Sequence, residues 1–147
     1  MEFYSHSDAH PHGWGYASIT ENDVKITRNP GKAATNEVLQ ERLKSDIIEK
    51  TALAHIRYAT IGNVEYMNCH PFAGKTKRGR QITLIHNGTI FEYPELQKYV
   101  NIQTGDTDSE RILIHFIHLI NDYEKEIGQE ANLFFLSLLS ILLFSIF

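Results

Sequence analysis

Four short runs of this sequence carry groups that could bind an amino acid and stabilise an oxyanion. They are residues 10–15 (HPHGWG), 55–60 (HIRYAT), 86–88 (HNG) and 105–110 (GDTDSE). Together they supply a fixed cation, a small hydroxyl, an amide beside a glycine N–H, and a carboxylate at the start of a predicted helix. Arginine binds carboxylates through two parallel N–H donors, and a carboxylate can receive an ammonium group. The runs therefore predict a pocket that holds a free amino acid by both charged ends.

Each of these residues taken alone also has a structural explanation. Arg57 follows an apolar predicted strand and could equally form a structural ion pair. Asn87 and Gly88 could direct two N–H donors at a developing oxyanion, but Asn-Gly is also a common turn. Asp108 falls in the first turn of a predicted helix, where capping accounts for a carboxylate, and capping explains Asp106 even better. These alternatives stay open until the runs are considered together.

The residues that must position these groups read as an α+β domain. Strands are predicted over residues 14–20, 24–28, 52–58 and 81–86, the first two forming a hairpin. Asn36 is predicted to cap a helix over 37–44 with Leu39 and Leu43 on one face. A helical turn is predicted at 93–96, and a capping box at 107–110 precedes a core helix over 112–123. Residues 59–81 form a long connection, a length that favours a functional loop.

Composition and charge narrow the class of protein. The 147 residues suit one domain, which we assign to residues 1–131, and the formal net charge of -4 argues against nucleic acid as a partner. The basic run at 75–80 is predicted to be a solvated loop. Cys69 is the one cysteine, so no internal disulfide can form. With no secretory signal visible, we expect a cytoplasmic protein.

The end of the chain, residues 132–147, is set apart as an apolar tail. Residues 133–147 are apolar except for three serines, and the run is short of the roughly 20 residues of a bilayer span. A tail anchor, a buried helix of an oligomer and an unnatural end from truncation or a shifted reading frame all remain open. The abrupt change of composition favours the unnatural end, so a membrane is not expected as a partner.

Eight histidines raise the question of a metal site. A zinc-dependent hydrolase using His10, His12 and His55 is one alternative, but no H-E-x-x-H or C-x-x-C run occurs. We therefore expect no metal and no cofactor. Cys69 stands beside His70 in the chain, but neighbours in sequence rarely form a catalytic pair, so Cys69 is predicted to be a small buried residue.

Taken in order, the four runs resemble the glutaminase domain of class II glutamine amidotransferases, which are N-terminal nucleophile hydrolases. The resemblance covers residues 3–125, and the His-Gly-Trp-Gly sequence is closer to stand-alone members of the family. It implies an αββα four-layer sandwich and the hydrolysis of glutamine to glutamate and ammonia. By the same resemblance, Arg57 would bind the α-carboxylate of L-glutamine and Thr60 would shape that end. Asn87 and Gly88 would form the oxyanion hole, and Asp108 would hold the α-amino group.

The sequence departs from the family at the nucleophile. In the family a cysteine follows the initiator methionine and its free amine acts as the base, whereas Glu2 follows Met1 here. Residues 3–7 resemble a segment that family members carry further along the chain. We therefore expect an incomplete sandwich, truncated at the N-terminus, that lacks the cysteine nucleophile and cannot turn over glutamine. A synthase partner would receive the ammonia in an active relative. The alternative is a non-catalytic module that binds an amino acid for regulation.

Overall fold

The computed structural model describes residues 2–20, 23–44, 51–133 and 135–137, and it has an α+β fold, as predicted. The elements of the first half are α1 (Glu2–Ala9), β1 (Trp14–Ile19), β2 (Val24–Asn29), the 3-10 turn η1 (Ala33–Thr35), α2 (Glu37–Lys44) and β3 (Thr51–Ile56). Those of the second half are the 3-10 turn η2 (Tyr66–Asn68), β4 (Phe72–Lys75), β5 (Gln81–Leu84), α3 (Pro94–Gln97) and α4 (Asp108–Ile127).

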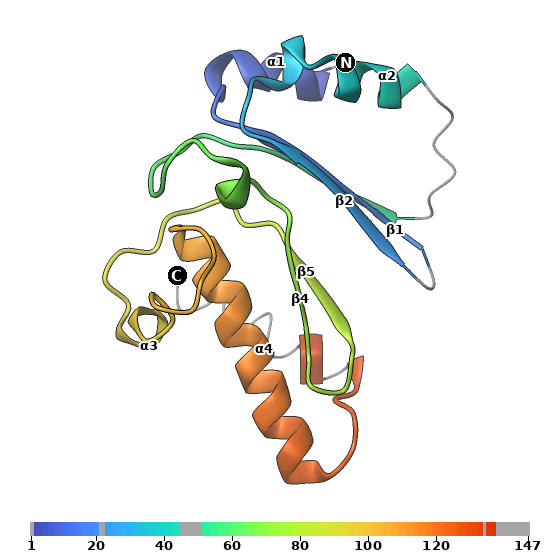
Figure 1. Ribbon diagram of the computed structural model, residues 1–147. Coiled ribbons are helices and arrows are strands. Elements are labelled where there is room, and N and C mark those ends of the chain that lie inside the picture. Colours follow the sequence, from blue (N-terminus) through green and yellow to red (C-terminus); the bar gives the residue numbers. More distant parts are fainter. Residues whose placement is uncertain (1, 21–22, 45–50, 134, 138–147) are drawn as a thin grey trace.

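The first sheet has β1 at its centre. Both β2 and β3 pair with β1 in antiparallel register, so that Trp14 lies opposite Asn29 on one side and Ile56 on the other. Helices α1 and α2 lie over one face of this sheet (Figure 1). Trp14 packs there against Ala33 and Leu39, and this cluster is the core of the N-terminal half.

Helix α2 begins where its cap was predicted. The Asn36 side chain accepts a hydrogen bond from the Leu39 N–H at 3.0 Å, which satisfies one of the free donors of the first turn. Leu39 and Leu43 lie one turn apart on the same face of α2, as predicted, but Leu39 is buried whereas Leu43 is 38% exposed. Leu39, one turn earlier than Leu43, packs against the buried Trp14 and Ala33.

The second sheet consists of β4 and β5 and packs against α4. The predicted long connection over 59–81 contains a strand that was not predicted, β4, which pairs with β5 from Phe72 opposite Leu84 to Lys75 opposite Gln81. Four residues give little periodic signal, so a strand this short depends on its partner. Beyond the sheet, a second core forms from residues of α3, α4 and the segment between them, Leu96, Tyr99 and Ile112.

One helix of the structure was not predicted, and another is longer than predicted. Helix α1 was not predicted at all. Helix α4 begins as expected, with the Thr107 hydroxyl accepting from the Glu110 N–H at 3.2 Å. It continues beyond Tyr123 to Ile127, and Gly128 ends it with φ 71° in the left-handed region that glycine adopts without strain.

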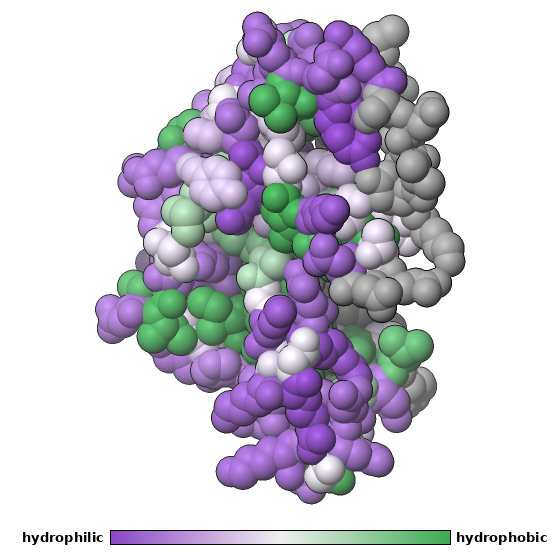
Figure 2. Space-filling view, turned by 45° about the vertical axis from the view of Figure 1, so that its right-hand side comes forward, coloured by the Kyte–Doolittle hydropathy of each residue, from purple (hydrophilic) through white to green (hydrophobic). Residues whose placement is uncertain are grey.

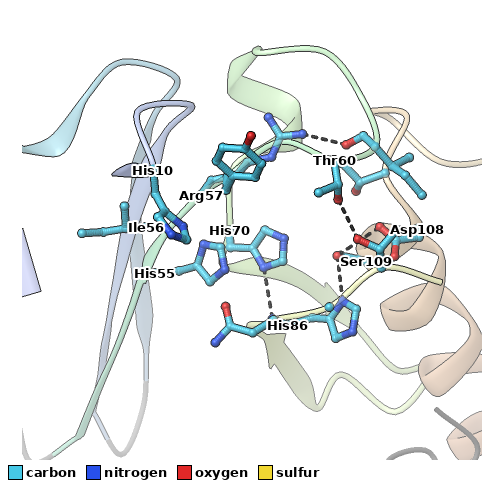
Figure 3. Close-up of a pocket in the computed structure, with 15 residues that line it drawn as sticks. His10, His55, Ile56, Arg57, Thr60, His70, His86, Asp108 and Ser109 are labelled. Atoms are coloured by element: carbon cyan, nitrogen blue, oxygen red, sulfur yellow. Dashed lines mark hydrogen bonds between the residues drawn. The ribbon is translucent and has the colours of Figure 1, made fainter. Parts of the chain in front are cut away.

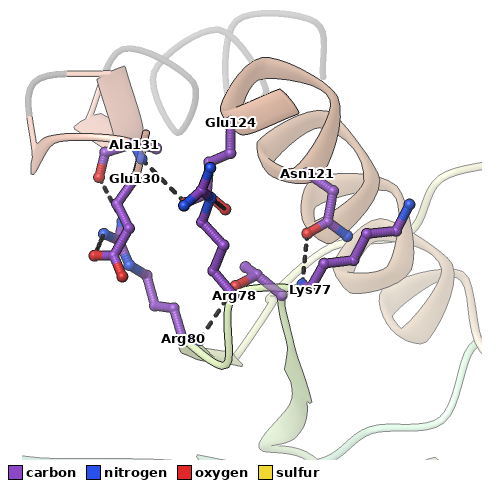
Figure 4. A network of polar contacts seen from close by, with 8 residues as sticks. Lys77, Arg78, Arg80, Asn121, Glu124, Glu130 and Ala131 are labelled. Atoms are coloured by element: carbon purple, nitrogen blue, oxygen red, sulfur yellow. Dashed lines mark hydrogen bonds and ion pairs between the residues drawn. The ribbon is translucent and has the colours of Figure 1, made fainter. Parts of the chain in front are cut away.

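The basic run at 75–80 forms the turn between β4 and β5 and holds the end of α4 (Figure 4). Arg80 donates to the Ala131 carbonyl at 2.7 Å and pairs with the Glu130 carboxylate at 3.0 Å. The buried Glu124 carboxylate accepts from the Ala131 N–H at 3.0 Å. The run is therefore only partly the solvated loop that was predicted, because Arg80 joins the second sheet to the chain after α4.

The described part of the predicted tail continues the fold. Asn132 caps a helical turn by accepting from the Phe135 N–H at 2.8 Å, and the Phe135 ring stacks on Tyr123 at 3.5 Å. Residues 138–147 lie outside the described residues, and the predicted boundary at 131 stays a prediction. Within the described segments, no helix combines the length and apolar character needed to span a membrane. The face shown in Figure 2 is mostly hydrophilic, with hydrophobic side chains in separate groups.

Candidate functional site

A cleft of about 270 Å³ lies where the end of β3, the segment after β5 and the start of α4 meet (Figure 3). All five residues singled out from the sequence line it: Arg57, Thr60, Asn87, Gly88 and Asp108. They come from three segments that are distant in the chain. Their convergence is the main geometric result at this site.

Arg57 stabilises one wall of the cleft. Its side chain is 4% exposed, and its backbone N–H donates to the Gly13 carbonyl at 2.8 Å, which ties it to the chain entering β1. The guanidinium donates to the backbone carbonyls of the loop that follows: Nη1 to Asn63 at 2.9 Å, and Nη2 to Ile61 at 2.9 Å and Gly62 at 3.3 Å. These three contacts use at most three of the five N–H donors of the guanidinium.

Asp106 braces the same loop from the other side. Its carboxylate accepts from the Asn63 N–H at 3.2 Å and from the side-chain amide of Asn68. The Asn68 side-chain oxygen accepts in turn from the Asp106 N–H at 2.9 Å. The capping explanation for Asp106 is therefore wrong, since Thr107 is the residue that caps α4.

Asp108 presents a buried carboxylate at the first turn of α4. It is 4% exposed, and its Oδ2 accepts from the Ile90 N–H at 2.7 Å. The free N–H groups and the dipole at a helix N-terminus favour a negative charge there. Thr60 and Thr89 also line the cleft, and their hydroxyls, 2.6 Å apart, join the loop after β3 to the segment after β5. Asp108 therefore has the position and the charge to receive a cation.

Three histidines form a connected group along the cleft (Figure 3). The rings of His55 and His70 stack with centroids 4.1 Å apart and planes 12° from parallel. The His70 Nδ1 accepts from the His86 backbone N–H at 3.1 Å, and the His86 Nδ1 lies 3.1 Å from the Ser109 hydroxyl. No role was predicted for this group. One signal was available, because His55 stands two residues before Arg57 in an extended run and so shares its face.

These histidines are neutral around pH 7. Burial lowers the pKa of His70 to about 2, and the positive charges of Arg57 and Arg28 lower it further. Burial also lowers the pKa of His55 and of His86. A neutral imidazole carries one donor and one acceptor, so each ring can hold two polar groups in defined positions.

The residues after β5 are held by this group. The Asn87 side chain and the His86 backbone both lie near His55 and partly offset the lowering of its pKa by burial. A Cβ placed on Gly88 would lie 2.8 Å from the Nε2 of His86, so the ring of that histidine occupies the space a side chain would need. A residue with a Cβ at this position would therefore have to displace the His86 ring.

Cys69 lies outside the cleft, as a small buried residue, which confirms the prediction. Its Sγ is 3.4 Å from the Asn29 carbonyl oxygen and 3.3 Å from that of Glu65. Burial raises the pKa of the thiol, which disfavours the nucleophilic thiolate.

The alternative of a zinc site finds no support in the geometry. His10 lines the cleft, but the Nδ1 of His12 accepts from the Ala59 N–H at 3.0 Å. Among the residues that the structure describes, no three His, Cys, Asp or Glu side chains are grouped so that they could hold a metal ion.

Comparisons with known proteins point to one family. Residues 3–142 match the family model described as glutamine amidotransferases class-II. The chain is 34% identical over 135 residues to an uncharacterized protein of Methanocaldococcus jannaschii, covering 88% of this chain and 36% of that protein. It is 33% identical over 132 residues to the glutamine–fructose-6-phosphate aminotransferase of Halalkalibacterium halodurans, covering 87% and 20%. It is 28% identical over 116 residues to the amidophosphoribosyltransferase of Bacillus subtilis, covering 76% and 24%. The chain thus spans about a fifth to a third of these relatives' lengths.

Proposed function

The chain belongs to the class II glutamine amidotransferases, and from this membership we propose that its cleft binds L-glutamine. The observation that carries the proposal is the convergence of Arg57, Asn87 and Asp108 on one cleft, together with the hydroxyl of Thr60 and the backbone of Gly88. A cation and an anion on opposite sides of a small cleft match the α-carboxylate and α-ammonium of an amino acid.

Each residue has a distinct part in the proposed complex. The N–H groups of Arg57 that do not bond the 61–63 loop receive the α-carboxylate, and Thr60 borders that end. Asp108 accepts from the α-ammonium with the oxygen that does not bond the Ile90 N–H. Asn87 and Gly88 donate to the carboxamide oxygen, where negative charge would develop if the amide carbon were attacked.

We propose further that the chain as printed binds glutamine without hydrolysing it. The support for this is that its one cysteine, Cys69, is buried away from the cleft with a raised pKa. Without a nucleophile such a site retains binding and oxyanion stabilisation but loses orders of magnitude in rate.

The two sheets and their flanking helices would be parts of the αββα sandwich of N-terminal nucleophile hydrolases. In an active form, an acceptor domain or a separate synthase would take up the ammonia.

Calorimetric titration of the full chain with L-glutamine tests binding. We expect saturable binding that Asp108→Asn weakens by about 10- to 100-fold, because a hydrogen bond between charged groups contributes about 1.5–3 kcal/mol. The asparagine oxygen can still accept from the Ile90 N–H, so this variant should keep its fold. N-acetyl-L-glutamine, which has no ammonium group, should bind weakly to both proteins. No heat of binding to the unaltered chain would overturn the proposal.

A glutaminase assay tests the second part. The printed chain should release no glutamate at an enzyme's rate. A variant extended at its N-terminus by a family member's Met-Cys strand should release glutamate, whereas the same extension carrying Cys→Ser should not. Turnover by the printed chain would show that another residue acts as the nucleophile.

A further inference from the structure

We propose that His86 and Ser109 are positioning residues, which fasten the segment carrying the proposed oxyanion donors to the carboxylate of Asp108. The inference rests on the proposed function and deepens it, because the two parts that are fastened together would hold opposite ends of a glutamine molecule. Their separation then determines which length of amino acid the cleft prefers.

A side-chain connection runs from His86 through Ser109 to Asp108 (Figure 3). The Nδ1 of His86 lies 3.1 Å from the Ser109 hydroxyl, which lies 3.5 Å from Oδ1 of Asp108. A carboxylate only accepts, so the hydroxyl proton is directed at Asp108 and the serine oxygen accepts from the ring. Burial lowers the pKa of His86, so the ring is neutral around pH 7 and its one proton is on Nδ1.

The same segment is attached to the start of α4 at a second point. Oδ2 of Asp108 accepts from the Ile90 N–H at 2.7 Å. Residues 87–88 thus lie between two attachments, one at His86 and one at Ile90, and both lead to the first two residues of α4. Asp108 and Ser109 are each 4% exposed, so water has little access to these hydrogen bonds. Two attachments prevent the pivoting that a single one would allow.

The His86 ring also packs against the glycine of this segment. A Cβ on Gly88 would lie 2.8 Å from Nε2 and 3.2 Å from Cε1 of the ring. The backbone N–H of His86 donates to the Nδ1 of His70 at 3.1 Å, which holds the residue at its base while Ser109 holds the ring. Donors that are held in place in advance need no reorganisation when charge develops on a bound carboxamide.

Three substitutions separate this role from a general loss of packing. Ser109→Ala removes the connection, whereas Ser109→Thr keeps the hydroxyl. Ser7→Ala is the matched control, because Ser7 is also buried and its hydroxyl accepts from the Ala34 N–H at 2.9 Å, but it does not line the cleft. The probes for calorimetry of the full chain are L-glutamine and L-asparagine. They share both charged ends, and the side chain of asparagine is one methylene shorter, so its carboxamide should not reach the donors.

We expect Ser109→Ala to weaken glutamine binding about tenfold, equivalent to about 1.4 kcal/mol, and to leave asparagine binding unchanged. The preference for glutamine should therefore fall by the same factor, and Ser109→Thr and Ser7→Ala should keep it. Equal loss for both probes in Ser109→Ala would mean that the serine supports only the carboxylate, and this result, like no loss for either probe, would overturn the inference. The proposed function would stand in both cases as long as the unaltered chain binds glutamine, and it fails if that chain binds none.

The ¹⁵N spectrum of the unaltered chain gives a test that needs neither a variant nor a ligand. Around pH 7 the His86 ring should carry its proton on Nδ1, with Nε2 unprotonated. A proton on Nε2 would mean that the Ser109 hydroxyl donates to the ring and not to Asp108. That result would break the connection and overturn the inference whatever the variants do.

Discussion

Gly15, the second residue of β1, lies directly against the backbone of His70. A Cβ on Gly15 would overlap the His70 carbonyl oxygen and lie 2.8 Å from its carbonyl carbon. The middle strand of the first sheet therefore touches the chain that leads into β4, in the second sheet.

Replacing Gly15 should consequently destabilise the protein. Gly15→Ala forces two backbones apart, and we expect a loss of about 1–3 kcal/mol in the free energy of unfolding, measured by urea titration. Gly74→Ala is the matched control in β4, because the close approach of its Cβ would be to the end of the flexible Ile117 side chain and not to backbone. Equal costs at the two positions would show that the close approach in the structure is wrong.

Acid should destabilise the folded chain below pH 6.5, the ordinary pKa of histidine. The pKa of His70 is about 2 in the folded chain, so between these values the unfolded chain binds more protons. Stability is therefore fully present above pH 6.5 and is lost as the pH falls, by about 1.4 kcal/mol per pH unit for His70 alone. The lowered pKa values of His55 and His86 act in the same direction.

Urea titrations at a series of pH values measure this slope. The variant His70→Asn offers an oxygen near the Nδ1 position and cannot titrate, so its stability should depend less steeply on pH. An unchanged slope in that variant would mean that other groups cause the acid sensitivity.

Asp106 should affect ligand binding without lining the cleft. The Asp106 carboxylate accepts hydrogen bonds from Asn63 and Asn68. In this way it holds the loop whose backbone carbonyls accept from the Arg57 guanidinium. Asp106→Ala removes these contacts, and we expect glutamine to bind up to about tenfold more weakly in calorimetry, since each hydrogen bond contributes about 0.5–1.5 kcal/mol. Asp106→Asn keeps an acceptor for the Asn63 N–H and should recover part of the affinity. Unchanged binding in the alanine variant would show that the loop keeps its form without this brace.

The thiol of Cys69 should be protected in the folded chain. It is fully buried between the carbonyls of Asn29 and Glu65, and burial raises its pKa. A disulfide reagent should modify it slowly in buffer and rapidly in urea, with a difference of orders of magnitude. The sulfur is packed so closely against Gly13 that a Cβ on that residue would lie 2.6 Å from it. Rapid modification in buffer would contradict this packing.

The local parts of the fold were predictable because their signals are local. Asn36 and Thr107 cap helices through residues three positions later, and such spacings are visible in the sequence. The short strand β4 and the helix α1 were missed. Four residues of β4 have no pattern of their own, and they form a strand because β5 lies beside them.

For the site, the sequence was sufficient to single out Arg57, Asn87, Gly88 and Asp108, because each belongs to a run whose residue types suit one ligand. The folded chain alone determined what those residues contact. The Arg57 guanidinium bonds three loop carbonyls, and the His70 ring, stacked on His55, accepts from the N–H of His86, the residue before Asn87. These contacts join residues on separate strands and loops. Their geometry depends on how closely the backbone of β1 approaches that of His70. The spacing of residues along the sequence does not reveal such an approach.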